Sequence, residues 1–265
     1  MTDKRLTWVA GDRPDSELDD VSRKNLAAQP QSGTSIFDPV LCELVYRWFC
    51  PPGGSVLDPF AGGSVRGIVA AKCGLHYTGI ELRHEQVAEN EKQAAETGSD
   101  ARWLCGDSIN ADTIAPGAYD LVFSCPPYYD LERYSDDIGE LSAMPTYEEF
   151  VAAYRTIVAK CCAMLKPDRF ACFVVGDIRD KRGFYRGLPC DTVRAFVDAG
   201  AGFYNDAVLV TPGGSLPIRV GKQFSSGRKL GKTHQNVLVF FKGDPSTIKG
   251  VFGNVEFGST DEAQP

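Results

Sequence analysis

Strand-like and helical segments alternate along this sequence, and this alternation restricts the folds open to the chain. Helical patterns cover residues 35–50, 62–74, 83–98, 146–167 and 189–201. Apolar runs that predict strands cover residues 55–60, 76–82, 101–108, 119–125 and 169–177. Such alternation is typical of a doubly wound α/β fold with a mostly parallel sheet.

The C-terminal part of the chain departs from this alternation. Residues 202–210 and 235–242 predict two strands with no helical pattern between them, which favours an antiparallel pair that closes the sheet. Residues 1–34 are polar and mixed in charge, so we interpret them as an N-terminal arm, and residues 243–265 as a loose tail. The folded domain is therefore expected to span residues 35–242.

Composition narrows the class of protein. The chain of 265 residues has 43% hydrophobic residues but no apolar run near the ~18 residues of a membrane span, and its N-terminus lacks the apolar core of a signal peptide. We expect a soluble cytoplasmic protein that makes no membrane contact. Nine cysteines without a Cys-x-x-Cys pair, and only three histidines, argue against disulfides and a metal site and favour reduced, mostly buried thiols.

Charge is distributed unevenly. The net charge is −7, yet residues 211–236 are Gly-rich and hold no acid. This segment carries five cations: Arg219, Lys222, Arg228, Lys229 and Lys232. A flexible basic loop on an acidic body is expected where a phosphate backbone meets one face of a protein, and a solvated loop is the alternative.

Polar residues follow the predicted strands at the edge where such sheets bind ligands. The strand ends read Asp58-Pro59-Phe60-Ala61-Gly62-Gly63, then Glu81, Asp107-Ser108, Ser124-Cys125-Pro126-Pro127-Tyr128, and Gly176-Asp177. Four of these five ends supply a carboxylate to one rim. Together they predict a binding site there.

The spacing of these residues indicates the ligand. Gly62 and Gly63 permit close backbone approach, although the GxGxxG pattern is absent. Glu81 stands where an acid accepts both hydroxyls of a ribose, and Asp107 can accept the amine of an adenine. Asp58 would repel a pyrophosphate and attract an ammonium. The predicted ligand is an adenosine that carries a cationic amino acid.

The segments "VLDPFAGGSVRG", "YTGIELR", "CGDS" and "CPPYYD" resemble, in this order, the motifs of S-adenosylmethionine-dependent DNA amino-methyltransferases, which modify N6 of adenine or N4 of cytosine. The resemblance spans residues 35–242 and implies a seven-stranded class I methyltransferase sheet with an antiparallel closing strand. It also implies S-adenosylmethionine as cofactor, S-adenosylhomocysteine as product and double-stranded DNA as partner. The motif order matches one of the permuted classes of the family.

The same resemblance assigns roles to residues around the cofactor. Phe60, Gly62 and Gly63 would line its methionine side, Glu81 its ribose, and Asp107 with Ser108 its adenine. Phe37 would cap the cofactor, although Asp38-Pro39 replaces the usual Lys-Pro of that motif.

The Pro-Pro-Tyr turn has the residues that methyl transfer to an exocyclic amine needs. An exocyclic amine is a poor nucleophile because its lone pair is delocalised into the ring. The carbonyl of Pro126, fixed by Pro127, can accept one amine hydrogen and turn the lone pair toward the methyl donor. Tyr128 would stack on a base that has left the duplex, a contact worth ~1–3 kcal/mol. Catalysis would then depend mainly on positioning.

Cys125 departs from the family pattern, which has Asp, Asn or Ser before Pro-Pro-Tyr. A thiol is a weak donor and acceptor, so the Pro126 carbonyl does most of the orienting, or Ser124 reaches into the site, or the chemistry differs. One different chemistry is attack on carbon six of a pyrimidine with methylation at carbon five. A catalytically weak protein is a further alternative.

Three segments are candidates for the DNA-facing surface: residues 129–145, 177–190 and 211–236. The first is acidic and would fold over the site, contact base edges or remain solvated. The second carries Arg179, Lys181, Arg182 and Arg186 beside the rim. Neither the second nor the third segment is long enough for a large recognition domain, so we expect a short target or relaxed specificity. An RNA or protein-glutamine methyltransferase and a non-catalytic nucleic-acid-binding relative remain alternatives, and the oligomeric state, monomer or homodimer, stays open.

Overall fold

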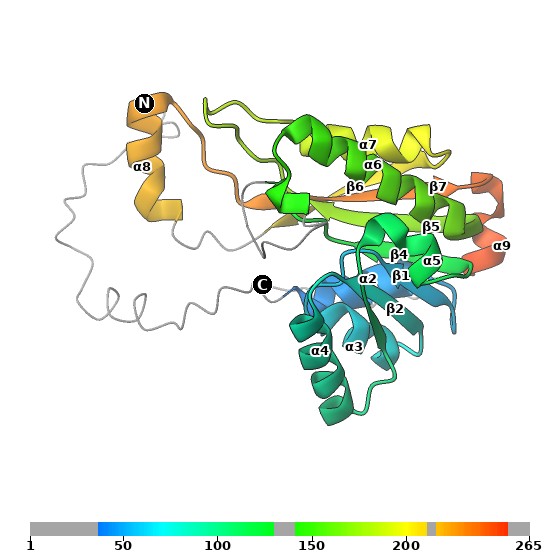
Figure 1. Ribbon diagram of the computed structural model, residues 1–265. Helices are drawn as coiled ribbons and strands as arrows, with labels where there is room; N and C mark the ends of the chain where they lie inside the picture. The colour runs from blue at the N-terminus through cyan, green and yellow to red at the C-terminus, as the bar shows by residue number, and fades with distance from the viewer. Residues whose placement is uncertain (1–36, 130–140, 211–215, 254–265) are drawn as a thin grey trace, which may run out of the picture. The chain divides into compact units, whose positions relative to one another are not determined.

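The computed structural model describes residues 37–129, 141–210 and 216–253 (Figure 1). These residues fall into two compact units. One contains the sheet and its helices, and the other contains residues 216–233. The strands are β1 (Ser55–Asp58), β2 (His76–Glu81), β3 (Arg102–Cys105), β4 (Tyr119–Ser124), β5 (Leu165–Val175), β6 (Gly202–Val210) and β7 (His234–Lys242).

The seven strands form one sheet in the order β3-β2-β1-β4-β5-β7-β6. Strands β1 to β5 pair in parallel, and β7 runs antiparallel to both β5 and β6. The predicted class I methyltransferase sheet with an antiparallel closing strand is confirmed. The strand order reverses between β1 and β4, whose carboxyl ends therefore lie side by side at the switch point where such folds bind ligands.

Helices cover both faces of the sheet (Figure 1). Their bounds are α2 (Pro39–Phe49), α3 (Val65–Lys72), α4 (His84–Thr97), α5 (Ala111–Ile114), α6 (Tyr147–Met164), α7 (Leu188–Asp198) and α9 (Ile248–Phe252). Helices α5, α6 and α7 pack on one face with Leu57 and Phe173, whereas α2, α3 and α4 pack on the other with Val56 and Cys172. Neighbouring residues of one strand thus enter different cores, because side chains alternate along a strand.

The sequence predicts Asp38-Pro39 as the cap and first turn of this helix and places Val40, Leu44, Val45 and Trp48 at helical spacing. Helix α2 begins there, but of these four apolar residues only Val45 is buried. Asp38 caps it through its carboxylate, and Pro39 occupies the first turn. Three apolar residues at helical spacing are nevertheless exposed: Val40, Leu44 and Trp48. The buried side chains are Cys42, Val45 and Tyr46, because α2 packs against α3 through them, and the Tyr46 hydroxyl donates to the Arg66 carbonyl at 2.7 Å.

Two predictions for the C-terminal part are wrong. The basic segment was expected to be a loop, but it contains helix α8 (Leu216–Gly227), in which Gly221 interrupts the helical sequence pattern. The tail was expected to be loose, but residues 245–252 form a short 3₁₀ turn and α9. Phe252 of α9 packs against Phe170 with ring centroids 5.1 Å apart, and this apolar contact holds the segment on the sheet. The predicted arm and residues 254–265 lie outside the described residues.

All nine cysteines are free, and five of them are buried, as the composition predicted. Burial raises the pKa of Cys42, Cys50 and Cys162 to about 12, so these thiols stay protonated and unreactive. Among the described helices, none has the length and apolarity that a membrane crossing requires.

Candidate active site

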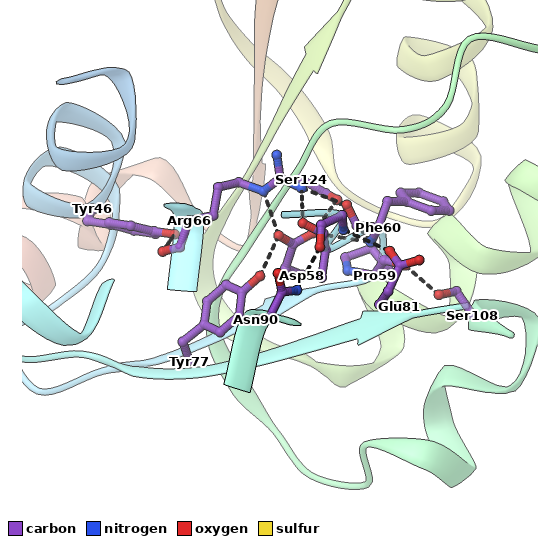
Figure 2. A network of polar contacts seen from close by, with 12 residues as sticks. Tyr46, Asp58, Pro59, Phe60, Arg66, Tyr77, Glu81, Asn90, Ser108 and Ser124 are labelled. Carbon is purple, nitrogen blue, oxygen red and sulfur yellow. Dashed lines mark hydrogen bonds and ion pairs between the residues drawn. The ribbon is translucent and has the colours of Figure 1, made fainter. Parts of the chain in front are cut away.

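The carboxylate of Asp58, the last residue of β1, is the centre of a buried polar network (Figure 2). Its Oδ2 accepts hydrogen bonds from Arg66 Nε at 2.6 Å and from the Tyr77 hydroxyl at 2.8 Å. Both Asp58 and Arg66 are at most 5% exposed, so the ion pair is shielded from water. Asp58 therefore supports the turn from within, and its carboxylate does not reach the rim where an ammonium was expected to meet it.

Arg66 of α3 also holds the backbone of the glycine turn. Its Nη2 donates to the carbonyl oxygens of Phe60 and Ala61 at 2.6 Å and 2.9 Å. The ring of Phe37 covers the guanidinium, with 4.5 Å between Arg66 Cζ and the ring centroid. Phe37, predicted to cap the cofactor, thus lies just before the N-terminus of α2, beside the ion pair of Asp58 and Arg66.

Ser124 joins the glycine turn to the Pro-Pro-Tyr turn. Its hydroxyl donates to Asp58 Oδ1 at 2.5 Å and accepts from the Phe60 amide at 3.2 Å. Ser124 is fully buried, so its hydroxyl faces the network rather than a substrate. The alternative in which Ser124 reaches into the site does not match this geometry, because both neighbours of the hydroxyl are inside the protein.

Gly62 is held by residues from the next strand and helix. Its φ is positive, at 52°, a backbone conformation that glycine adopts readily and that is strained for residues with a side chain. Its amide donates to Glu81 Oε2 at 3.0 Å, and its carbonyl accepts from Asn90 Nδ2 at 2.7 Å. Glu81, whose side chain is 12% exposed, also accepts from the Arg83 amide at 3.0 Å. Glu81 and the exposed Gly63 therefore lie at the predicted rim.

The end of β3 is tied to the same turn. Asp107 caps a 3₁₀ turn (Ser108–Asn110), and its Oδ1 accepts from the Ile109 amide at 2.9 Å. The buried Ser108 hydroxyl donates to the Pro59 carbonyl. Strand ends of β1, β2, β3 and β4 are thus connected by side-chain hydrogen bonds, as Figure 2 shows for most of them.

Gly67 explains how α3 lies close enough for this network. A Cβ at this position would come within 2.4 Å of the Trp103 ring and 2.9 Å of the Tyr77 ring. Only glycine permits this approach of α3 to the sheet, which carries Arg66 over Asp58.

Tyr128 is held from three sides in the Pro-Pro-Tyr turn. Its hydroxyl accepts from Gln235 Nε2 at 2.6 Å and lies 3.7 Å from the Cys125 sulfur. Its ring lies against Gly176 at the end of β5, where a Cβ would be 3.5 Å from the ring. Pro126 is buried and Pro127 is half-buried. The half-buried ring of Tyr128 thus has a fixed position at the carboxyl ends of β4 and β5.

The next residue, Tyr129, turns the chain away. Its φ of 34° is unusual for a side chain of this size and is the kind of backbone strain found at functional turns. Its ring packs against Tyr147 and Phe150, each with centroids 5.6 Å apart. The guanidinium of Arg186 also lies 4.9 Å from the Tyr129 ring centroid. The adjacent residues Tyr128 and Tyr129 therefore contact different parts of the protein.

The predicted DNA-facing residues belong to both units of the chain. Arg179, Lys181 and Arg182 lie between β5 and α7 in the unit with the sheet, where Asp177, the fourth of the predicted rim acids, accepts from the amides of Gly187 and Leu188. The cations of the other unit are exposed or half-buried: Arg219, Lys222, Arg228, Lys229 and Lys232. Of the predicted segment 129–145, residues 130–140 lie outside the described residues.

Sequence reasoning missed four residues of the site. Arg66, Tyr77, Asn90 and Gln235 each donate to a residue of the two turns. Arg66 had a detectable signal, because an arginine within the apolar segment "VRGIVAAK" needs a buried partner. In the described part of the chain, His, Cys, Asp and Glu side chains form no group of three or more that suits a metal ion.

Comparisons with known proteins agree with the fold. No protein-family model matches the sequence, and no curated protein does. TrmN from Thermus thermophilus superposes with a TM-score of 0.54 and 17% identity over 80% of this chain and 51% of that one. The [4+2]-cyclase SpnF has a TM-score of 0.51 and 18% identity over 77% and 80% of the two chains.

A third solved structure supports the same fold. A putative sarcosine dimethylglycine methyltransferase from Galdieria sulphuraria has a TM-score of 0.50 and 14% identity over 77% of this chain and 84% of that one. The chain has the class I methyltransferase fold. Because a cyclase shares this fold, the reaction has to be argued from the site.

Proposed function

We propose that this protein is an S-adenosylmethionine-dependent methyltransferase that modifies an exocyclic amine of a flipped base in DNA. One observation carries the proposal. Ser124, fully buried, joins the glycine turn after β1 to the Pro-Pro-Tyr turn after β4 at the switch point of the sheet. The turn suited to the cofactor and the turn suited to the target amine are therefore held in a fixed relation, as transfer between two bound reactants requires.

The residues at the rim fit the proposed cofactor. Glu81 presents a carboxylate that can accept ribose hydroxyls, and Asp107 stands at the neighbouring strand end, where an adenine amine can donate to it. Gly62 and Gly63 have open space where a Cβ would lie, so the methionine side can approach the backbone, and Phe60 lies beside them. When bound, the cofactor supplies an activated methyl group.

The chain's own contribution is orientation. The Pro126 carbonyl would accept one hydrogen of the target amine, and the rigid Pro127 would hold that carbonyl in place. The Tyr128 ring, fixed by Gln235 and Gly176, offers its face to the base. The Cys125 sulfur lies 3.7 Å from the Tyr128 hydroxyl and would form part of the surface that meets the base. These residues favour a positioning mechanism in which no strong base takes part.

Two basic regions support a nucleic acid as substrate. Arg219 and Lys222 stand three residues apart on α8 and are exposed, and Arg228 follows the helix. Lys181 and Arg182 are exposed beyond β5, beside the carboxyl end of the sheet. A protein with a net charge of −7 that places cations in these segments is suited to a polyanion at limited regions of its surface.

Incubation with tritiated S-adenosylmethionine tests the substrate class. Unmethylated DNA, RNA and a protein mixture are supplied separately, and acid-precipitable label is counted for each. We expect label in DNA. Label only in RNA or only in protein would show that this molecule, and not DNA, is the substrate. A protein that binds the cofactor but labels none of the three would be a non-catalytic relative.

Glu81→Ala is expected to weaken binding of S-adenosylmethionine by roughly 10-fold to 150-fold, since a charge-assisted hydrogen bond contributes ~1.5–3 kcal/mol. The variant also removes the acceptor of the Gly62 amide, which adds to the loss. Titration calorimetry measures the affinity, and Glu85→Ala, an exposed acid in the first turn of α4, is the matched control. Unchanged affinity in Glu81→Ala would reject the ribose assignment.

Cys125→Ser is expected to retain or raise activity, because amine methylation needs the thiol only as part of the pocket wall. Methylation at carbon five would require a covalent bond from the sulfur to carbon six of the pyrimidine, so the same variant would be inactive. Incubation with a 5-fluorocytosine oligonucleotide separates the two mechanisms. A wild-type adduct that persists on a denaturing gel and disappears in Cys125→Ser would contradict the amine mechanism.

A further inference from the structure

The segment between β5 and α7 is an ordered hairpin. The Asp180 amide donates to the Phe184 carbonyl at 2.8 Å, and the Phe184 amide returns a bond to Asp180 Oδ1 at 2.8 Å. The Gly183 amide donates to the Asp180 carbonyl at 2.9 Å, and the Arg186 amide to the Ile178 carbonyl at 2.9 Å. These bonds make residues 178–186 a defined projection beyond the sheet (Figure 1).

The hairpin presents aromatic rings among cations. Phe184 is 63% exposed and Tyr185 is 45% exposed, which is unusual for large apolar side chains on a short turn. Arg182 Cζ lies 5.3 Å from the Phe184 ring centroid, and Arg179 Cζ lies 3.8 Å from that of Tyr185. Lys181 is exposed at the tip. Asp180, the acid of the tip, directs its carboxylate to backbone amides of the hairpin itself.

The base of the hairpin is connected to the candidate active site. Gly176, two residues before the hairpin, lies against the Tyr128 ring. Arg186, its last residue, places its guanidinium 4.9 Å from the ring centroids of both Tyr129 and Tyr147. The hairpin therefore leaves the sheet beside the pocket where the target base would lie, and its base is packed against the tyrosine that follows Tyr128.

We propose that this hairpin is a wedge, in which Phe184 enters the base stack beside the flipped nucleotide while Lys181 and Arg182 contact the adjoining phosphates. The inference rests on the proposed function and adds a residue that drives opening of the duplex. A base that leaves the helix costs a few kcal/mol of stacking and pairing, and an apolar ring inserted between base steps offsets part of this cost. The exposed cations Lys181 and Arg182 beside the ring match the charge of the backbone.

Native and heat-denatured DNA separate the role of a wedge from a general role in catalysis. Phe184→Ala is expected to lower methylation of native DNA at least ~10-fold while methylation of denatured DNA stays within about 2-fold, because opening costs a few kcal/mol only in the duplex. Phe184→Leu, which keeps an apolar side chain, should recover part of the loss. Phe203→Ala is the matched control, since Phe203 is 44% exposed and pairs with Phe240, whose partner Ala171 lies within β5, away from the carboxyl end that the hairpin follows.

Binding gives a second readout that does not depend on turnover. Lys181→Ala and Arg182→Ala should each lower the salt slope of duplex binding by about one unit, as expected for one phosphate contact. Equal loss of activity on native and denatured DNA in Phe184→Ala, or no loss on either, would overturn the wedge while the proposed function stands. A wild-type protein that methylates neither form of DNA would overturn both.

Discussion

Arg66→Leu is expected to lower the free energy of unfolding by about 3–5 kcal/mol, the usual cost of removing one partner of a buried ion pair. The Asp58 carboxylate is 0% exposed and would lose its counter-ion, and the carbonyls of Phe60 and Ala61 would lose their donor. Chemical denaturation followed by circular dichroism measures the change. Cofactor affinity should fall with it, because the glycine turn loses its support.

Two control variants separate the buried pair from a general effect of removing an arginine. Arg47 pairs with Glu43 on the exposed surface of α2, so Arg47→Leu should change the stability by less than ~0.5 kcal/mol. The double variant with Asp58→Asn and Arg66→Leu should regain part of the loss, since no unpaired charge stays buried. A single variant Arg66→Leu that is as stable as the wild type would show that the network does not support the turn.

Tyr128→Ala should lower methyl transfer by roughly 5-fold to 150-fold, because stacking on a base contributes ~1–3 kcal/mol. Stacking on the Tyr128 ring would engage only the target base, so affinity for S-adenosylmethionine should stay near the wild-type value. Single-turnover kinetics at saturating cofactor measure the rate of methyl transfer, and calorimetry measures the affinity for S-adenosylmethionine.

Tyr128→Phe is the matched variant for this test. It keeps the ring and removes the hydroxyl that accepts from Gln235, so it should retain most of the activity if the ring face matters. An equal collapse of cofactor affinity and activity in Tyr128→Ala would mean that the ring belongs to the cofactor pocket or to the core. Equal losses in Tyr128→Phe and Tyr128→Ala would assign the effect to the hydroxyl instead.

The seven strands and most helices could be predicted from the sequence because their signals are local. The run "YDLVFSC" shows a buried strand without knowledge of its neighbours, and Asp38-Pro39 marks the start of α2. The buried face of α2 could be predicted only in part, since Val45 of the apolar stripe is buried whereas Val40, Leu44 and Trp48 are left exposed by the packing against α3. Helix α8 was missed because Gly221 interrupts its pattern.

The positions of the site residues were predictable, but their partners were not. The acids at the strand ends follow from the topology of a parallel sheet. That Asp58 is buried against Arg66 depends on how closely α3 returns over β1, which Gly67 permits. The bond between Gln235 and Tyr128 joins residues 107 positions apart, and that between Asn90 and Gly62 joins residues 28 apart. Such pairs arise only from the tertiary fold.

The position of the transferred methyl group tests the central claim most directly. DNA labelled by the wild-type protein with the tritiated cofactor is digested to nucleosides, which are separated beside methylated standards. The account predicts that the label co-migrates with N6-methyl-deoxyadenosine or N4-methyl-deoxycytidine and is lower in the Tyr128→Ala reaction at equal time. Label in 5-methyl-deoxycytidine, or no label in any deoxynucleoside, would contradict it.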